Sequence, residues 1–331
     1  MRNGRVSEAL RVESWGVVAA SLAGGLVLLA IGGEFVVRGA VGVARKFGIS
    51  ELMIGLTLVG FGTSSPELAA SINAALAGSP GIAVGNVVGS NISNVLLIFA
   101  IVAIIRPIPV DSKALQRDGW VMLAATAAFI AVAVVLGEVS RLTGAIFLAA
   151  LIGYILLAYA MERRKPAVAQ MHAAEAQQHS PAPSPLWHSA AFAIAGLAML
   201  IFGADLLVGG AQTIARAAGL SETIIGLTIV ALGTSLPELV TSVMAALKGR
   251  SDVAFGGIIG SNIYNILGII GVTALVQPIA VPVDLLARDW AALYVATLLV
   301  LLHANTGGKV NRYEGAFLLL HYAGYCWLLL A

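Results

Sequence analysis

The stretch from Gly60 to Ile72, GFGTSSPELAASI, lies inside an apolar run that is long enough to cross a membrane. It places Pro66 and Glu67 beside glycines and hydroxyl side chains. A charged carboxylate at the centre of a membrane helix costs about 2.5–3.5 kcal/mol, and a proline cannot donate to the carbonyl four residues back. The stretch therefore predicts a helix that is broken at membrane depth. Such a break is tolerated only where it is buried in protein or lines a wet cavity.

The composition of the chain indicates a membrane protein. Of its 331 residues, 59% are hydrophobic and 11% are charged, whereas a soluble domain has about 25% charged residues. Apolar runs of about 20 residues, the length that spans a bilayer, recur from Val17 to the end of the chain. Cys326 is the one cysteine and cannot form an internal disulfide. The scattered basic residues and the net charge of +2 indicate no nucleic-acid partner.

The sequence contains a long internal repeat. Residues 48–107 align without a gap with residues 219–278 at a constant offset of 171, and 30 of the 60 positions are identical. The motif GLTLVGFGTSSPEL, which starts at Gly55, matches GLTIVALGTSLPEL, which starts at Gly226. The protein therefore consists of two homologous halves.

A second pair of motifs follows at the same spacing. GNVVGSNISN, from Gly85, matches GGIIGSNIYN, from Gly256, and the weaker similarity outside the motifs places Glu34 on Asp205. The paired glycines of these motifs are small residues four apart, which allow membrane helices to approach closely.

Each half contains five apolar segments, and five is an odd number, so the second half must enter the membrane from the opposite side. Secondary transporters built from inverted repeats have this arrangement, with a site at the bilayer midplane. We therefore predict an all-α polytopic membrane protein with ten transmembrane helices, arranged as two inverted five-helix repeats with broken helices at the midplane. The predicted segments are 15–42, 51–78, 82–106, 118–137 and 141–161, and then 187–212, 221–248, 253–277, 289–304 and 311–331.

The domain boundaries follow from these segments. The first repeat is predicted to cover residues 1–161, with its motif region at 55–94, and the second to cover residues 187–331, with its motif region at 226–265. Residues 162–186 between them are polar, contain proline and lack periodicity, so they predict a linker loop.

The distribution of lysine and arginine predicts the orientation. With the linker in the cytoplasm, 13 of the 19 basic residues lie inside and 6 lie outside, as the positive-inside rule favours. The chain is thus expected to be a multi-pass protein of the cell (inner) membrane with both termini outside.

Polar residues cluster around the two predicted breaks. Thr63 and Glu67 are four apart on one helical face with Ser64 beside them, and Ser90 and Asn94 are four apart on the next helix. The second half supplies the equivalent residues Thr234, Ser235, Glu238, Ser261 and Asn265. The alternative is a purely structural role, in which these groups only form hydrogen bonds between helices. Two symmetry-related glutamates, each directly after a proline, favour an ion site instead.

This set of oxygen atoms suits a hard cation. Calcium takes about 6–8 oxygen ligands in adaptable geometry, and sodium is also satisfied by carbonyl, hydroxyl and carboxylate oxygens. Softer metals prefer imidazole or thiolate ligands, and the motifs contain neither. Two carboxylates carry a charge of −2, which one Ca²⁺ or two Na⁺ would neutralise, so the same oxygens could bind the two ions alternately.

The duplicated GTSxPEL and GSNIxN motifs resemble the α-repeats of the calcium/cation antiporter superfamily, and specifically the prokaryotic two-repeat form of its sodium/calcium exchanger family. The likeness covers both repeats and the ten-helix layout, which is nearly the whole chain. It implies that Glu67 and Glu238 are central ligands for calcium and sodium. It also implies further ligands at Thr63, Ser64, Ser90, Asn94, Thr234, Ser235, Ser261 and Asn265, and at the backbone carbonyls of Gly60 and Ala231.

One position departs from the family pattern. Exchangers of this kind often have Asp where this chain has Asn265, and in potassium-dependent relatives that acid is tied to potassium. Potassium co-transport is therefore not expected. Proton/calcium antiporters of the superfamily place a further acidic residue in the third helix, and this chain has none there, which argues against protons as the driving ion.

The sequence thus predicts a sodium/calcium antiporter, not an enzyme, that works by alternating access as a monomer in the lipid bilayer. Its transported Ca²⁺ and Na⁺ are the only ligands expected, with no tightly bound cofactor. A proton/calcium or other cation/calcium antiporter on the same scaffold is the alternative, and a passive channel also remains open. An intramembrane hydrolase is disfavoured, because no HExxH motif is present and no histidine of the central segments could activate a serine.

Overall fold

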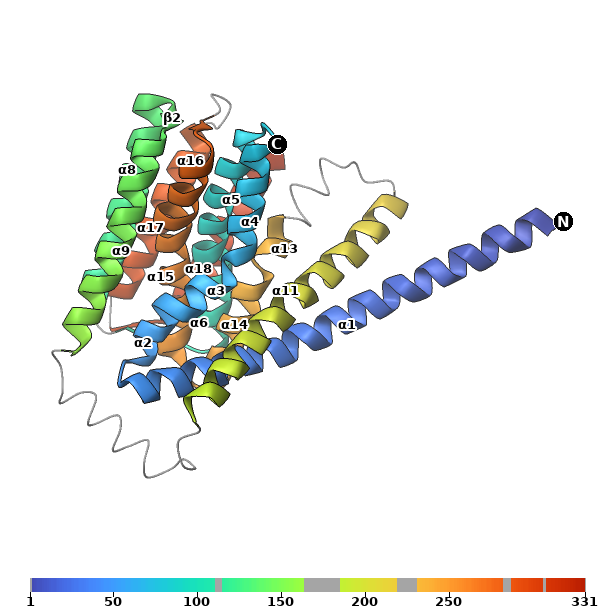
Figure 1. The fold of residues 1–331 in the computed structure, drawn as a ribbon, viewed down its shortest axis with the longest axis horizontal. Helices are drawn as coiled ribbons and strands as arrows, with labels where there is room; N and C mark the ends of the chain where they lie inside the picture. The colour runs from blue at the N-terminus through green and yellow to red at the C-terminus, as the bar shows by residue number, and fades with distance from the viewer. Residues whose placement is uncertain are drawn as a thin grey trace.

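The computed structural model describes residues 2–110, 115–163, 185–218, 231–281, 287–305 and 308–330. Helices dominate these residues and occupy the positions of the ten predicted segments (Figure 1). In the first half, the first span is α1 (Arg2–Phe47) and the fifth is α9 (Arg141–Arg163). The second span consists of α2 (Glu51–Ile54), η1 (Gly55–Val59), α3 (Gly60–Thr63) and α4 (Ser65–Leu76). The third span consists of α5 (Pro80–Ser93), η2 (Asn94–Phe99) and α6 (Ala100–Ile105), and the fourth consists of η3 (Leu115–Gly119) and α8 (Trp120–Leu136).

The second half repeats this order. Its described elements are α11 (Leu186–Ala217), α13 (Ala231–Thr234) and α14 (Leu236–Leu247), α15 (Ser251–Ile263), η5 (Tyr264–Ile270) and α16 (Gly271–Val276), α17 (Ala287–Asn305) and α18 (Arg312–Leu330). The predicted linker 162–186 and the start of the predicted segment 221–248 lie largely outside the described residues.

Most helix ends lie within a few residues of the predicted ends, but α1 begins at Arg2 instead of residue 15. Hydropathy marks only the apolar part of a helix, and a polar N-terminal extension carries no such signal. Among the described segments, six are long and apolar enough to cross a bilayer unaided: Trp15–Phe47, Pro80–Ile105, Leu115–Leu136, Arg141–Met161, Leu186–Ala217 and Ser251–Val276. The others are the two broken helices and the more polar α17 and α18.

The two halves are inverted relative to each other. The start of α2 and the end of α14 lie at the same end of the bundle, where Arg250 pairs with Glu51, so the two broken helices run in opposite directions. Thr126 of α8 and Thr297 of α17 occupy equivalent places in the halves, and their hydroxyl oxygens lie 3.5 Å apart. A residue that contacts its own symmetry mate lies on the pseudo-two-fold axis.

Two short antiparallel strand pairs also join the halves, which the all-α prediction did not include. β1 (Ile108–Pro109) pairs with β4 (Lys309–Val310), and β2 (Glu138–Val139) pairs with β3 (Ile279–Ala280). Each pair links a loop of one half to a loop of the other, at opposite ends of the bundle.

Helices α1 and α11 form a long antiparallel pair that runs obliquely across the bundle (Figure 1). Glycines line the seam between them. A Cβ added at Gly25 would lie 2.8 Å from the carbonyl oxygen of Gly203, and one at Gly32 would lie 2.9 Å from that of Gly196. These contacts are related by the repeat symmetry, so both halves contribute equally to a close backbone approach.

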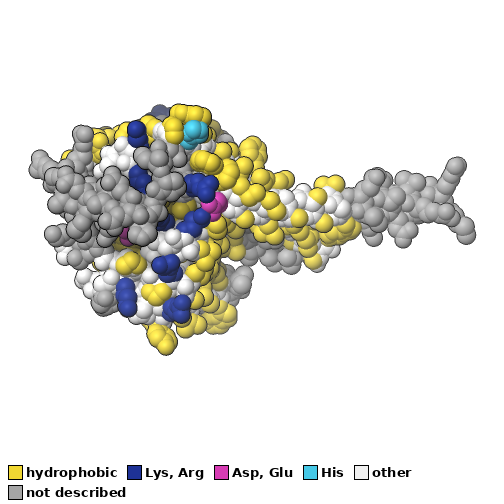
Figure 2. Space-filling view, turned by 90° about the horizontal axis from the view of Figure 1, so that it is seen from below, with side chains coloured by type: hydrophobic (Ala, Val, Ile, Leu, Met, Phe, Trp, Pro, Cys, Tyr) yellow, Lys and Arg dark blue, Asp and Glu magenta, His cyan; other side chains and the backbone are white. Residues whose placement is uncertain are grey.

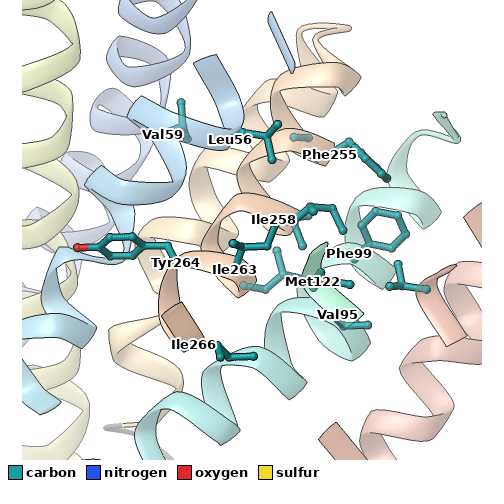
Figure 3. Packing of buried hydrophobic residues seen from close by; sticks show 14 of the residues in the cluster. Leu56, Val59, Val95, Phe99, Met122, Phe255, Ile258, Ile263, Tyr264 and Ile266 are labelled. Carbon is teal, nitrogen blue, oxygen red and sulfur yellow. The ribbon is translucent and has the colours of Figure 1, made fainter. Parts of the chain in front are cut away.

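The remaining spans interlock across the halves. Leu56, Phe99 and Ile258 come from three different spans and meet in one buried hydrophobic core (Figure 3). α15 packs closely against α2 and η1 of the first half: a Cβ at Gly260 would lie 2.5 Å from the carbonyl oxygen of Leu56. The predicted close contact is confirmed for Gly256 and Gly260, whereas a Cβ at Gly85 or Gly89 would meet none of the described residues within 4 Å. α18 likewise packs on α6, and α9 packs on α16.

Candidate ion-binding site

The second span of each half is broken at a serine. α3 ends before Ser64 (φ −83°, ψ 8°), and α13 ends before Ser235 (φ −90°, ψ 6°). Pro66 lies in the first turn of the helix that follows, as its counterpart does in the second half, which confirms the predicted breaks. Glu67 also lies in that first turn, where the helix dipole stabilises negative charge.

Each serine at a break donates to the glutamate of the other half. Ser64 Oγ donates to Glu238 Oε1 at 2.8 Å, and Ser235 Oγ donates to Glu67 Oε1 at 3.4 Å. The side chain of Thr63 also interacts with Glu238. The two motifs, 171 residues apart in sequence, therefore form one continuous polar cluster.

Both glutamates are buried, with only 1% of Glu67 and 3% of Glu238 exposed. Their carboxylates lie close enough to repel each other. The Oε2 atom of each has no hydrogen-bond partner among the described residues. A buried polar atom without a partner costs about 1–3 kcal/mol, and a cation between the two carboxylates would remove both that cost and the repulsion.

Two asparagines present further unpaired atoms. Asn94 and Asn265 are each 1% exposed, and within the described part of the chain neither the amide nitrogen nor the amide oxygen of either residue has a partner. Both lie in π-helical segments, η2 and η5, that follow a regular helix. Such π-helical turns are frequent at functional sites.

The backbone carbonyl of Gly60 lies at the contact between the halves. Ser261 Oγ donates to it at 3.4 Å, and Thr63 Oγ1 donates to the carbonyl of Val59 at 3.0 Å. The first half thus presents a carbonyl oxygen to α15 directly before the break.

The remaining predicted residues lie on α5 and α13. Ser90 is buried on α5, but the hydrogen bonds of the described residues do not link it to either glutamate. Thr234 is half-buried at the end of α13, and Ala231 begins α13 at the place equivalent to Gly60. Their contribution to ion binding remains a prediction.

The structure adds residues that the sequence reasoning missed. Asn86 donates to the backbone carbonyl of Glu67 at 3.1 Å and to Ser71 Oγ at 3.0 Å, which ties α5 to the glutamate-bearing helix. Its equivalent is Gly257, so a search for polar residues present in both halves does not find it. Thr241, buried one turn after Glu238, has an unpaired hydroxyl among the described residues. Ser71 does recur as an equivalent serine, and that repetition was the available signal.

The candidate site has few charged ligands for a metal site. The described residues contain no group of three or more His, Cys, Asp or Glu side chains that could hold a metal ion. Two carboxylates with hydroxyl, amide and carbonyl oxygens fit a hard cation. With few charges, such a site can bind the ion and also release it.

Comparison with known proteins identifies the family of the chain. Residues 17–160 and 188–331 each match the family described as sodium/calcium exchanger protein. CaxA of Alkalimonas amylolytica is 39% identical over 315 residues, which cover 92% of this chain and 96% of CaxA. The sodium/calcium exchanger MaX1 of Methanosarcina acetivorans is 33% identical over 335 residues, with 91% and 95% covered.

A solved structure shows the same architecture. The sodium-calcium exchanger NCX_Mj, solved in the presence of Na⁺ and Ca²⁺, superimposes with a TM-score of 0.77 and 33% identity over 92% of this chain and 96% of that one. Together with the match of both halves to the family, this similarity shows that the chain belongs to the sodium/calcium exchanger family.

Proposed function

We propose that this membrane antiporter exchanges sodium for calcium at the cluster around Glu67 and Glu238. The observation that carries the proposal is the reciprocal pairing of serine and glutamate between the halves. It leaves one buried carboxylate oxygen on each glutamate without a partner among the described residues. One Ca²⁺ or two Na⁺ would balance the charge of the pair, and the similarity to MaX1 and NCX_Mj supports these two ions.

The proposed ligand set joins both halves. The carboxylates of Glu67 and Glu238 are its centre, with oxygens from Thr63, Ser64, Ser90, Asn94, Thr234, Ser235, Ser261 and Asn265 and the carbonyls of Gly60 and Ala231 around them. Because one chain supplies both halves of the site, the monomer is the proposed working unit. The predicted division into two repeats joined by residues 162–186, with the linker in the cytoplasm, belongs to the same proposal.

Alternating access follows from the binding chemistry. In an antiporter, the site changes its access from one side of the membrane to the other only when one of the two ions is bound. Binding of either ion must therefore be coupled to the change of access. The oblique α1–α11 pair crosses the two broken helices, where Leu197 of α11 lies beside Gly62 of α3 and Gly33 of α1 lies beside Val240 of α14. We propose that movement of this pair across the broken helices exposes the site to one side at a time.

The test is uptake of ⁴⁵Ca into proteoliposomes loaded with sodium. We expect uptake that requires an outward sodium gradient and that is absent with potassium or proton gradients alone. Uptake driven by a pH gradient without sodium would indicate the proton/calcium alternative, and uptake without any counter-ion would indicate a channel. Either result would reject sodium/calcium exchange.

Two variants assign the transport to the site. We expect Glu67→Gln and Glu238→Gln each to reduce sodium-dependent calcium flux to background, because the amide removes one of the two charges that balance calcium. The matched control is Glu138→Gln, which makes the same change at an exposed residue of β2. Normal flux in either glutamate variant would show that ions are bound elsewhere.

A further inference from the structure

The turns that follow the two broken helices have the same backbone but different chemistry. Gly78 and Gly249 are equivalent residues with φ of 72° and 73°, a left-handed conformation that favours glycine. In the first half the residues flanking this glycine are Ala77 and Ser79, whereas in the second half they are Lys248 and Arg250.

Both basic residues of the second turn pair with acids of the first half. Lys248 Nζ contacts the carboxylate of Glu34 on α1, and Arg250 donates to Glu51 Oε1 at the start of α2 at 2.7 Å. The four side chains are between 24% and 38% exposed, so water screens these pairs only in part. They connect α14 to both α1 and α2 at the end of the bundle where α9 ends and α11 begins, which we call the linker face.

The opposite face cannot form the same contacts. The equivalent of Glu34 is Asp205, which is exposed, and the cation that would meet it by symmetry is replaced by Ala77. The equivalent of Arg250 is Ser79. By sequence, the ion pairs of Lys248 and Arg250 therefore have no counterpart at the opposite face, where Ala77 and Ser79 stand at the equivalent positions.

Helix packing also differs between the two faces. A Cβ at Gly33 of α1 would lie 2.9 Å from Met244 and from Val240, which are half-buried on α14. Their equivalents on α4, Asn73 and Ala69, are both exposed. In the described chain α1 packs along α14, whereas α11 packs on α3, α13 and α14.

We propose that the Lys248–Arg250 turn is a one-sided latch that holds the linker face of the ion pathway closed. The pathway then opens at the opposite face, along Asn73. The inference rests on the proposed alternating access. The two-fold repeat symmetry gives two symmetry-related states, one open to each face, and two ion pairs present in only one of them favour that state. Partly exposed pairs of this kind shift such an equilibrium by about fivefold together.

The test replaces the latch with the residues of the other turn. Lys248→Ala with Arg250→Ser gives the second half the side chains of the first half at these two positions. Reporter cysteines at Asn73 and Met244, introduced singly with Cys326→Ala, measure access at the two faces by the rate of maleimide labelling in detergent. In the protein with an intact latch we expect Asn73→Cys to react faster than Met244→Cys. In the double variant we expect labelling of Met244→Cys to rise about fivefold and labelling of Asn73→Cys to fall.

Two controls separate the latch from net charge and from misfolding. Arg45→Ser with Lys309→Ala removes the same charge through two exposed residues, and it should leave both labelling rates unchanged. The swap Glu51→Arg with Arg250→Glu preserves one pair in reversed order and should keep Met244→Cys protected. Unchanged rates in the Lys248→Ala/Arg250→Ser variant, or an equal change in the charge control, would overturn the latch. Labelling needs no ion gradient, so a failure of sodium/calcium exchange would be seen separately, in the flux assay alone.

Discussion

The glutamate of each half at the centre of the protein is held by a serine of the other half. A serine hydroxyl donates to one oxygen of each glutamate, and the second oxygen has no partner among the described residues. The same logic applies to Asn94 and Asn265, whose amide groups are buried without partners in the described structure. Natural proteins rarely leave such groups unpaired. The exceptions therefore mark the positions where a ligand is expected.

Substitution of a buried asparagine should change thermal stability and calcium transport in opposite directions. We expect Asn265→Leu to raise the melting temperature in ion-free buffer, because it removes an unpaired amide worth about 1 kcal/mol. The same variant should weaken calcium transport. Thermal unfolding in detergent and ⁴⁵Ca flux measure the two effects.

The matched control for this test is Asn262→Leu. The Asn262 amide donates to the carbonyl of Ile258 at 2.7 Å, so its loss should lower the melting temperature. A fall in melting temperature for Asn265→Leu as well would show that its amide is a structural hydrogen bonder and not a ligand.

The sequence predicted a polar cluster at the two breaks, but it did not predict how the serines and glutamates there pair. The repeat, the prolines and the spacing of Glu67 to Thr63 locate the break and the polar face. The hydrogen bond from Ser64 to Glu238 depends on how two helices that are far apart in the sequence pack together, and a local sequence pattern cannot indicate that packing. Asn86 was missed because it breaks the repeat symmetry, and its importance follows only from its contact with the backbone of Glu67.

Among the helices, the α1–α11 pair depends on glycine more than on large side chains. Its seam allows backbone oxygen atoms to approach the facing helix closely at Gly25 and Gly203. Without a hydrophobic driving force in lipid, membrane helices associate through such close packing. We therefore expect the pair to behave as one stiff unit in the proposed movement across the broken helices.

Neighbouring glycines of α1 test this seam. We expect Gly25→Val to destabilise the protein by about 1–3 kcal/mol, because the new side chain would overlap the Gly203 backbone. Gly24→Val is the control, since a Cβ there would meet none of the described residues within 4 Å. Thermal unfolding of both variants measures the difference. Equal stability of the two would show that the seam is not tightly packed.

The positions of the helices were largely predictable, because a segment that crosses lipid must be apolar and must satisfy its backbone hydrogen bonds within its own helix. The exceptions have tertiary causes. The π-helical segments η2 and η5 and the strand pairs β1–β4 and β2–β3 form where the two halves meet, and a local pattern in one half cannot indicate them.

On the scale of the whole molecule, inverted halves place different charges at the two ends. Basic side chains gather on the linker face (Figure 2), and the residues near that face include Arg45, Lys46, Arg106, Lys248, Arg250, Lys309 and Arg312. Duplication makes the backbones similar, and these side chains make the two ends unequal.

The charge distribution gives a prediction about orientation. We expect the linker face to lie in the cytoplasm, since this arrangement places 13 of the 19 basic residues inside. Alkaline phosphatase fused after the last residue should then be active in a bacterial host, and the same enzyme inserted within residues 162–186 should be inactive. The reverse pattern would place the linker outside.

The interlocked spans have a consequence for how the protein is made. α6 packs against α18, and α16 packs against α9, so neither half can complete its interior from its own helices. During synthesis the early spans must wait in the bilayer until the final one has left the ribosome. Membrane quality control therefore has a long interval in which to act on an unfinished chain, in which Glu67 still lacks the Ser235 hydroxyl of the second half.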